Sequence, residues 1–193
     1  MAGGAPVRRA LDHPGKGARR RREIIEAAAE IIVAEGPGAV THREVAARAA
    51  CSLSATTYYF SGIEELLEAA GAHLLGRWAE QAERVRDDLR TSVPGTRRAD
   101  VVGPVLTALL PHVGEVRGRY QQLLAAGASP ALARAYRSGR ARLEAAVTDI
   151  LAAAGSTCPG PLAVAVVDGA VVSALSEGRD VRKTAADLLR RVV

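Results

Sequence analysis

The chain has 193 residues, 48% of them hydrophobic and only 3% aromatic, which predicts one or two compact domains with a real core. Alanine, leucine, valine and arginine dominate and β-branched alternation is scarce, so an all-α fold is expected. The formal net charge is +5, and residues 1–22 carry seven basic residues and one acid. Such a segment either only solubilises the chain or is drawn to phosphate.

The N-terminal stretch is expected to be a basic arm followed by a helix. Residues 1–18 are rich in glycine and proline, which predicts disorder, and they contain no apolar segment typical of a secretory signal. From Arg19 onward, apolar residues recur at three- and four-residue spacing between Ile24 and Ile32, and Gly36 is a typical helix end. A first helix over 19–35 follows.

Two short helices are predicted next. Thr41 and Glu44 have the spacing of a capping box, which predicts a helix over 41–49. Ser52 is a good N-cap for a second helix over 53–60. Two short helices joined by a three- or four-residue turn form a helix-turn-helix arrangement, which many DNA-binding proteins use.

The second short helix, within the stretch AACSLSATTYYF, has an unusual outward face. Helical periodicity turns Thr56 and Phe60 inward, and it turns Ser54, Ala55, Thr57 and Tyr58 largely outward. That face is small, hydroxylic and phenolic, with no charge, which suits the major groove of DNA. The alternative is that Tyr58 and Tyr59 pack in the core of a small domain, and the position of Tyr59 is half-buried in either case.

Three stretches together resemble the TetR family of transcriptional regulators. They are IIEAAAEIIVAEG (24–36), VTHREVAARAACSLSATTYYF (40–60) and GIEELLEAA (62–70), in the order and spacing of that family's first four helices. The resemblance implies a head at 19–62 and a helical effector-binding and dimerisation domain at 63–193, after an arm at 1–18. It also implies a homodimeric, small-molecule-responsive regulator that represses from a palindromic operator.

The resemblance also implies which residues contact DNA. Base or groove contacts fall to Ser52, Leu53, Ser54, Ala55 and Thr57, and phosphate contacts to Thr41, Arg43, Tyr58 and Tyr59. The family usually has glycine at position 50, a bulky aliphatic residue at 56 and a basic residue at 63, where this chain has Ala50, Thr56 and Ile63. The last difference removes one expected phosphate contact, and its loss either weakens binding or shifts that role to Arg43 or the arm. Cys51 is either a small buried residue of the turn or a thiol sensor.

The remainder is predicted to be helical. One long helix is expected over 62–90, followed by helices at about 97–113, 115–127, 130–154, 161–176 and 180–193. The resemblance implies that 130–154 and 161–176 form a four-helix bundle with a second copy; the alternative is that both pack inside the monomer. A mainly aliphatic effector pocket is expected, with these candidate lining residues: Trp78, Leu106, Leu110, Tyr120 and Leu124.

Other functions have little support in the sequence. The four histidines (His13, His42, His73, His112) are dispersed, so no catalytic, metal or cofactor site is expected. The most apolar segment, 162–175, is interrupted by Asp168 and Gly169, so no membrane span is expected. Cys51 and Cys158 form no CxxC pair, which favours a reducing cytoplasm. The alternatives are a helical enzyme, or a ligand-binding or membrane-surface protein without sequence-specific DNA binding.

Overall fold

The computed structural model describes residues 14–91, 100–111 and 113–193, and all regular structure in these ranges is helical. The α-helices are α1 (Pro14–Glu35), α2 (His42–Arg48), α3 (Leu53–Tyr59), α4 (Ile63–Thr91), α5 (Val102–Leu109), α6 (Val116–Ala125), α7 (Pro130–Ala153), α8 (Gly160–Glu177) and α9 (Val181–Leu189). Short 3₁₀ turns occupy Pro37–Ala39, Val113–Glu115 and Ala126–Ala128. The expected all-α fold is confirmed.

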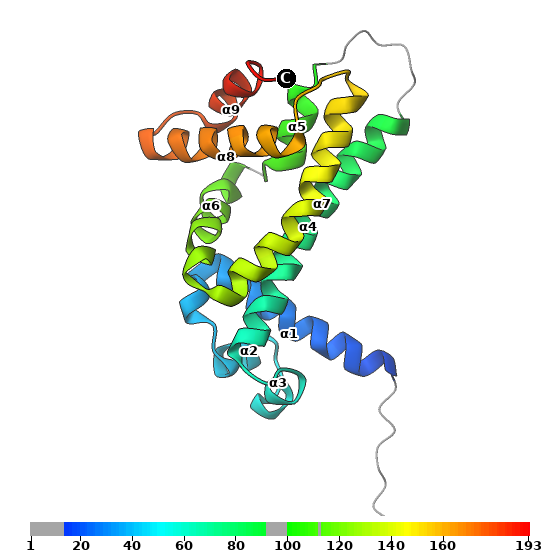
Figure 1. Cartoon of the computed structure of the whole chain (residues 1–193). Helices are drawn as coiled ribbons and strands as arrows, with labels where there is room; N and C mark the ends of the chain where they lie inside the picture. The colour runs from blue at the N-terminus through cyan, green and yellow to red at the C-terminus, as the bar shows by residue number, and fades with distance from the viewer. Residues whose placement is uncertain (1–13, 92–99, 112) are drawn as a thin grey trace, which may run out of the picture.

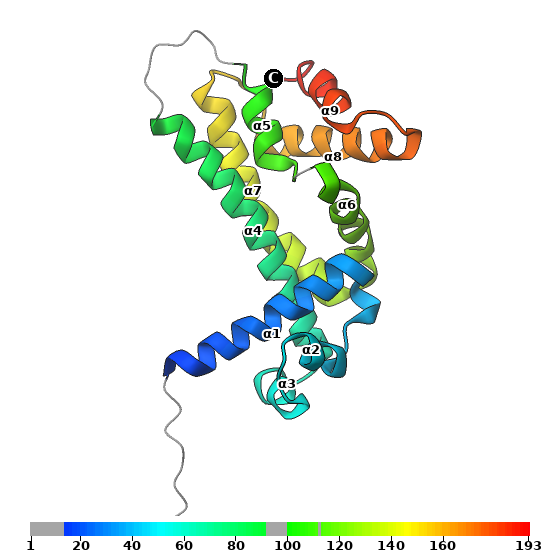
Figure 2. The ribbon, with the colours of Figure 1, turned by 180° about the vertical axis from the view of Figure 1, so that it is seen from behind.

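Helix α4 connects two hydrophobic clusters at opposite ends of the molecule. The head cluster joins α1, α2 and the first half of α4 around Phe60, whereas the second cluster joins α5, α7, α8 and α9. Figure 1 shows α1, α2 and α3 at one end, and α5, α8 and α9 at the other, with α4 and α7 running side by side between them. Seen from behind in Figure 2, α6 extends from the α8 end toward α1.

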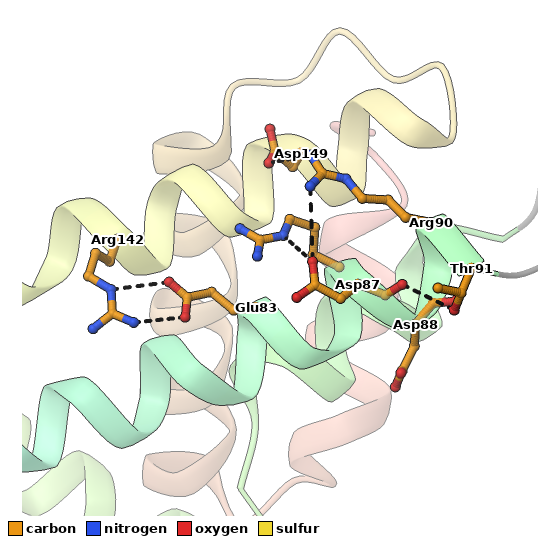
Figure 3. A network of polar contacts seen from close by, with 8 residues as sticks. Glu83, Asp87, Asp88, Arg90, Thr91, Arg142 and Asp149 are labelled. Carbon is orange, nitrogen blue, oxygen red and sulfur yellow. Dashed lines mark hydrogen bonds and ion pairs between the residues drawn. The ribbon is translucent and has the colours of Figure 1, made fainter.

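The long contact between α4 and α7 depends on small residues and on ion pairs at its edges. A Cβ atom on Gly139 of α7 would lie 2.6 Å from the Cβ of Leu75, so only glycine allows this approach. Figure 3 shows the bidentate pair between Arg142 of α7 and Glu83 of α4, with N–O distances of 3.1 and 2.7 Å. Exposed pairs of this kind contribute only about 0–1 kcal/mol each. Packing therefore holds the two helices together, and the exposed ion pairs add little to it.

Several helix ends differ from those predicted. Helix α1 begins at Pro14, five residues earlier than expected, because proline fits the first turn of a helix and because this turn lies against α3. Helix α5 ends at Leu109 rather than 113, since Leu110 precedes Pro111 and is extended. Helix α9 ends at Leu189 instead of 193. The rest of the predicted arm (1–13), with His13, residues 92–99 and His112 lie outside the described residues.

Helix α8 is the one helix of the described ranges that is long and apolar enough to cross a membrane by length and composition. One side of it, including Ala163, Val167, Ala170 and Val171, is buried in the second cluster. This packing is that of a core helix, and the opposite side of α8 remains exposed.

Candidate nucleic-acid interface and adjoining cavity

The turn between α2 and α3 is fixed by local hydrogen bonds. The amide of Glu44 donates to Thr41 Oγ1 at 3.1 Å, and the amide of Ala55 donates to Ser52 Oγ at 3.2 Å, so both predicted N-caps are confirmed. Between them, Ala50 has a φ of +48°, a left-handed conformation that favours glycine. The half-buried Cys51 follows, and its amide donates to Ala46 at 3.0 Å. The turn is thus well defined, although the residue at position 50 strains it.

The inward side of α3 seats the helix on the head cluster. Phe60 is 1% exposed, and the guanidinium of Arg21 lies 4.9 Å from the centre of its ring. Thr56 is fully buried; its hydroxyl donates to the Leu53 carbonyl at 2.8 Å and lies 3.2 Å from His42 Nδ1. These contacts explain how a threonine replaces the aliphatic residue that is usual there: its hydroxyl is fully hydrogen-bonded.

The outward side of α3 has the predicted uncharged surface. Ser54, Thr57 and Tyr58 are exposed, Tyr58 by 77%. The Thr57 hydroxyl donates to Ser54 O at 3.2 Å, a weak intrahelical bond that a base or phosphate can replace. Tyr59 is half-buried and meets the Tyr58 ring edge-on, with 5.0 Å between ring centres.

The structure brings all nine predicted DNA-contacting residues to the α2–α3 end of the molecule. Exposed residues are Thr41, Arg43, Ser52, Leu53, Ser54, Thr57 and Tyr58, and half-buried ones are Ala55 and Tyr59. This placement gives them access to a partner, and their individual roles stay predictions.

Basic residues of α1 adjoin this surface. A Cβ on Gly17 would lie 3.5 Å from the Tyr59 hydroxyl, so the first turns of α1 lie beside the end of α3. Lys16, Arg19 and Arg22 are exposed there, although Arg19 also pairs with Glu23 at 3.5 Å. A phosphate backbone laid across α3 would therefore meet positive charge on α1.

Comparison with protein families gives two matches along the chain. A model of bacterial regulatory proteins of the tetR family matches residues 24–70, and a model of the tetracyclin repressor-like C-terminal domain matches residues 94–193, more than half of the chain. The chain belongs to the TetR family. It is therefore a DNA-binding transcriptional regulator, and the family is not enzymatic.

Solved structures agree with the family assignment. The multidrug binding protein EbrR complexed with imidazole is 29% identical, with 90% of this chain and 94% of that chain covered and a TM-score of 0.64. A TetR-family member from Streptomyces coelicolor is 28% identical, with 90% and 98% covered and a TM-score of 0.59. A transcriptional regulator from Rhodococcus is 20% identical, with 89% and 95% covered and a TM-score of 0.67, and shares the fold. Among curated proteins, none matches.

A cavity of about 150 Å³ lies between α4, α6, α7 and α8 of this TetR-family protein. Its lining is Leu75, Trp78, Arg119, Leu123, Tyr136, Arg137, Arg140, Leu143 and Asp168. A larger hollow of about 400 Å³ adjoins this cavity, and Trp78 and Arg119 line both. The lining thus contains arginines and aromatic rings beside three leucines, whereas a mainly aliphatic pocket was expected.

The five predicted pocket residues have different positions. Trp78 lines the 150 Å³ cavity. Leu106 and Tyr120 are buried in the second cluster, and the Tyr120 hydroxyl donates to Asp168 at 2.9 Å, behind the cavity wall. Leu110 borders a separate surface hollow, and Leu124 is 68% exposed and lines none of the cavities described.

Sequence reasoning missed the other eight lining residues of the cavity, Arg119 and Tyr136 among them. Burial lowers the pKa of Arg119 from its ordinary value and raises the pKa of Tyr136 to about 12. A signal for Arg119 was present: it lies three residues after the buried Val116 and four before Leu123, on the apolar side of α6. No group of three or more His, Cys, Asp or Glu side chains in the described ranges could hold a metal ion.

Proposed function

We propose that this regulator is a homodimeric repressor that binds a palindromic operator and is released from it by a small molecule. The observation that carries the proposal is the outward side of α3, an exposed and uncharged row of hydroxyls on a helix seated firmly by Phe60 and Thr56. Hydroxyls that project from a rigid helix can reach base edges and phosphates in the major groove. Such a regulator acts on the genome, which places it in the cytoplasm.

The proposal assigns DNA binding and effector binding to different parts of the chain. The head at 19–62 carries the DNA interface, and residues 63–193 form the effector-binding and dimerisation domain. The arm at 1–18 includes the first turn of α1, so part of its charge is held beside α3. Helix α4 links the two domains, because its residues contribute to both hydrophobic clusters.

A second copy of this chain is the proposed partner of α8. Its exposed side consists of small and apolar residues, among them Leu162 (47% exposed), Ala165, Gly169 and Val172 (41%). A Cβ on Gly169 would meet nothing within 4 Å, so this glycine leaves room for another helix. The outward side of α7, with Ala141, Ala145 and Thr148, is similarly small, although its inner side is buried against α4. Two-fold symmetry would set the two α3 helices about 34 Å apart or somewhat more on a palindrome.

The cavity beside α4 supports the proposed release by an effector. Structures of EbrR are described as complexes with imidazole, proflavin, ethidium and malachite green, which supports a small-molecule site in this chain too. The cavity at Trp78 touches α4, which carries the head, and α6, which contacts α1. A coupling of about 1–3 kcal/mol between ligand and DNA would lower DNA affinity about five- to 150-fold.

DNA binding by the full chain tests this function directly. Gel shifts with the intergenic DNA beside its own gene, repeated across salt concentrations, should give a dissociation constant near ~10⁻⁸ M or tighter on a palindrome. Scrambled DNA should bind far more weakly, and the salt slope should be about −0.9 per neutralised phosphate. Sedimentation should show a dimer. Binding to anionic vesicles as strong as to DNA, with no preference among sequences, would instead favour a membrane-surface protein.

A further inference from the structure

The cavity of about 150 Å³ has the size of a single ring. Its apolar surface comes from Leu75, Leu123 and Leu143, with the Trp78 and Tyr136 rings crossing edge-on at 5.7 Å between centres. A cavity of similar volume lined by apolar side chains is known to accept benzene. Size and lining therefore fit a ligand with one small apolar ring or a short branched chain.

Two buried hydrogen-bond donors at this cavity lack acceptors. Nη1 of Arg119 and the hydroxyl of Tyr136 are both buried, and neither has a hydrogen-bond partner in the described parts of the chain. The raised pKa of Tyr136 keeps its hydroxyl protonated at neutral pH, so it remains able to donate. A guanidinium stays protonated even when burial lowers its pKa. Unsatisfied buried donors are unfavourable, so both groups would gain from an acceptor in the cavity.

The Arg119 guanidinium is held in place although no carboxylate binds it. It lies over the Trp78 ring at 4.0 Å, a cation–π contact that orients the planar group. Such stacking leaves the N–H groups at the edge of the guanidinium for a ligand, and an oriented guanidinium matches a carboxylate geometrically. The contact with Trp78 thus fixes the position of the guanidinium, while Nη1 has no hydrogen-bond acceptor in the described parts of the chain.

The acid at the cavity is already neutralised. Asp168 accepts hydrogen bonds from Tyr120 at 2.9 Å and from Arg140 at 3.1 Å, and Arg140 also binds Glu144 at 2.8 Å. Asp168 is therefore a poor site for a cation. In the described ranges neither Arg119 nor Arg137 forms an ion pair with a carboxylate, although the charge of Asp168 acts on Arg119 from a greater distance. With three arginines and one aspartate, the lining carries excess positive charge.

We propose that this cavity binds a small organic anion, a carboxylate on a single ring or short branched chain, with its carboxylate on Arg119 and Tyr136 and its apolar part among the leucines. This inference rests on the proposed effector site and names its ligand class. The anion would also act on the head, because Arg119 lies on α6, which contacts α1, and because Leu123 packs against both hydrophobic clusters.

Three probes of similar size and different charge test the proposal on the full chain: benzoate, benzamide and benzylamine. Calorimetric titration should show saturable binding of benzoate, with benzamide at least about tenfold weaker and benzylamine weaker still, since hydrogen bonds to a charged group are the strong ones. No saturable benzoate binding in the millimolar range, or equal binding of benzoate and benzamide, would overturn the proposal.

Variants locate the site. Arg119→Met should remove the preference for benzoate over benzamide, Arg119→Lys should retain part of it, and Tyr136→Phe should weaken benzoate binding by a smaller factor. Arg117→Met is the matched control, because Arg117 is an exposed arginine on the same helix, and it should leave binding unchanged. If Arg119→Met unfolds the protein, the titrations of Arg119→Lys and Tyr136→Phe still show whether these two residues bind the carboxylate. A benzoate preference that survives both of these variants unchanged contradicts the assignment.

Gel shifts on the same preparations separate this inference from the proposed function. Operator binding without any preference for benzoate means that the ligand class is wrong and the repressor function stands. Benzoate selectivity that depends on Arg119, without specific DNA binding, means that the repressor proposal fails and the anion site stands.

Discussion

Helices α3 and α8 each bury one side and expose a side without charge, but the chemistry of the two exposed sides differs. On α3 the exposed residues carry hydroxyls, as in Ser54, Thr57 and Tyr58. On α8 they are small and apolar, as in Ala165 and Gly169. A surface of hydroxyls can form hydrogen bonds with a polar partner such as DNA, whereas a small apolar surface gains only by close packing. The comparison teaches that the side chains on an uncharged exposed side of a helix indicate its partner: hydroxyls favour a polar partner, and small apolar residues favour a closely packed one.

The largest expected effect is a loss of stability on the buried side of α3, with little change on its exposed side. Phe60→Ala removes a ring that is 1% exposed and should lower the free energy of unfolding by about 3–5 kcal/mol. Tyr58→Ala is the control, because Tyr58 is 77% exposed, and it should change stability by less than about 0.5 kcal/mol. Urea unfolding followed by circular dichroism measures both. Equal losses in the two variants would mean that α3 is not seated as described.

The same separation applies to α8. A Cβ on Gly160 would meet the Thr148 hydroxyl and lie 2.5 Å from the backbone oxygen of Glu144, so Gly160→Ala should destabilise the chain by about 1–3 kcal/mol. A Cβ on Gly169 would meet nothing in the same chain, and Gly169→Ala should leave the fold intact.

The dimer should respond in the opposite order. Gly169→Leu places a bulky side chain where two copies of α8 are proposed to approach each other. It should therefore raise the dissociation constant of the dimer, measured by sedimentation, while the helical content stays unchanged. An unchanged dimer in this variant would remove α8 from the interface and leave the fold as it stands.

The head was more predictable from the sequence than the cavity, for a physical reason. The caps at Thr41 and Ser52 and the inward position of Phe60 depend on neighbours within four residues, so spacing alone predicts them. The start of α1 at Pro14 was missed, because Gly15 and Gly17 in its first turn belong to a stretch whose glycine and proline content predicted disorder.

The cavity depends on residues distant in the sequence. Arg119 has its position only because α4 brings the Trp78 ring beneath it, and Tyr136 reaches the same space from α7. Sequence spacing cannot predict contacts between residues so far apart in the chain. For the same reason Leu124 was expected at the pocket, although it faces solvent. The long helices were predictable as elements, and their mutual arrangement was not.

A smaller effect distinguishes two exposed residues of α3 by what each contacts. Tyr58→Phe should weaken binding to all DNA sequences alike, by about 1 kcal/mol, since a phosphate contact carries no sequence information. Thr57→Ala should instead change which sequence is preferred, because its hydroxyl is placed to reach a base edge. Anisotropy titrations against cognate and scrambled duplexes measure both. Equal loss on the two duplexes in Thr57→Ala would count against base reading by this residue.

The smallest expected effect concerns the turn that sets α3 on α2. Ala50 has a φ of +48°, and in the left-handed region a side chain costs about 1–2 kcal/mol, which glycine avoids. Glycine also gains more entropy in the unfolded chain, worth about 0.4–1 kcal/mol in the other direction. Ala50→Gly should therefore stabilise the head by about 0.5–1 kcal/mol in thermal unfolding. Because Ala50 lies outside α3, its replacement should leave the sequence preference intact; a shift in preference would mean that the turn itself contacts the operator.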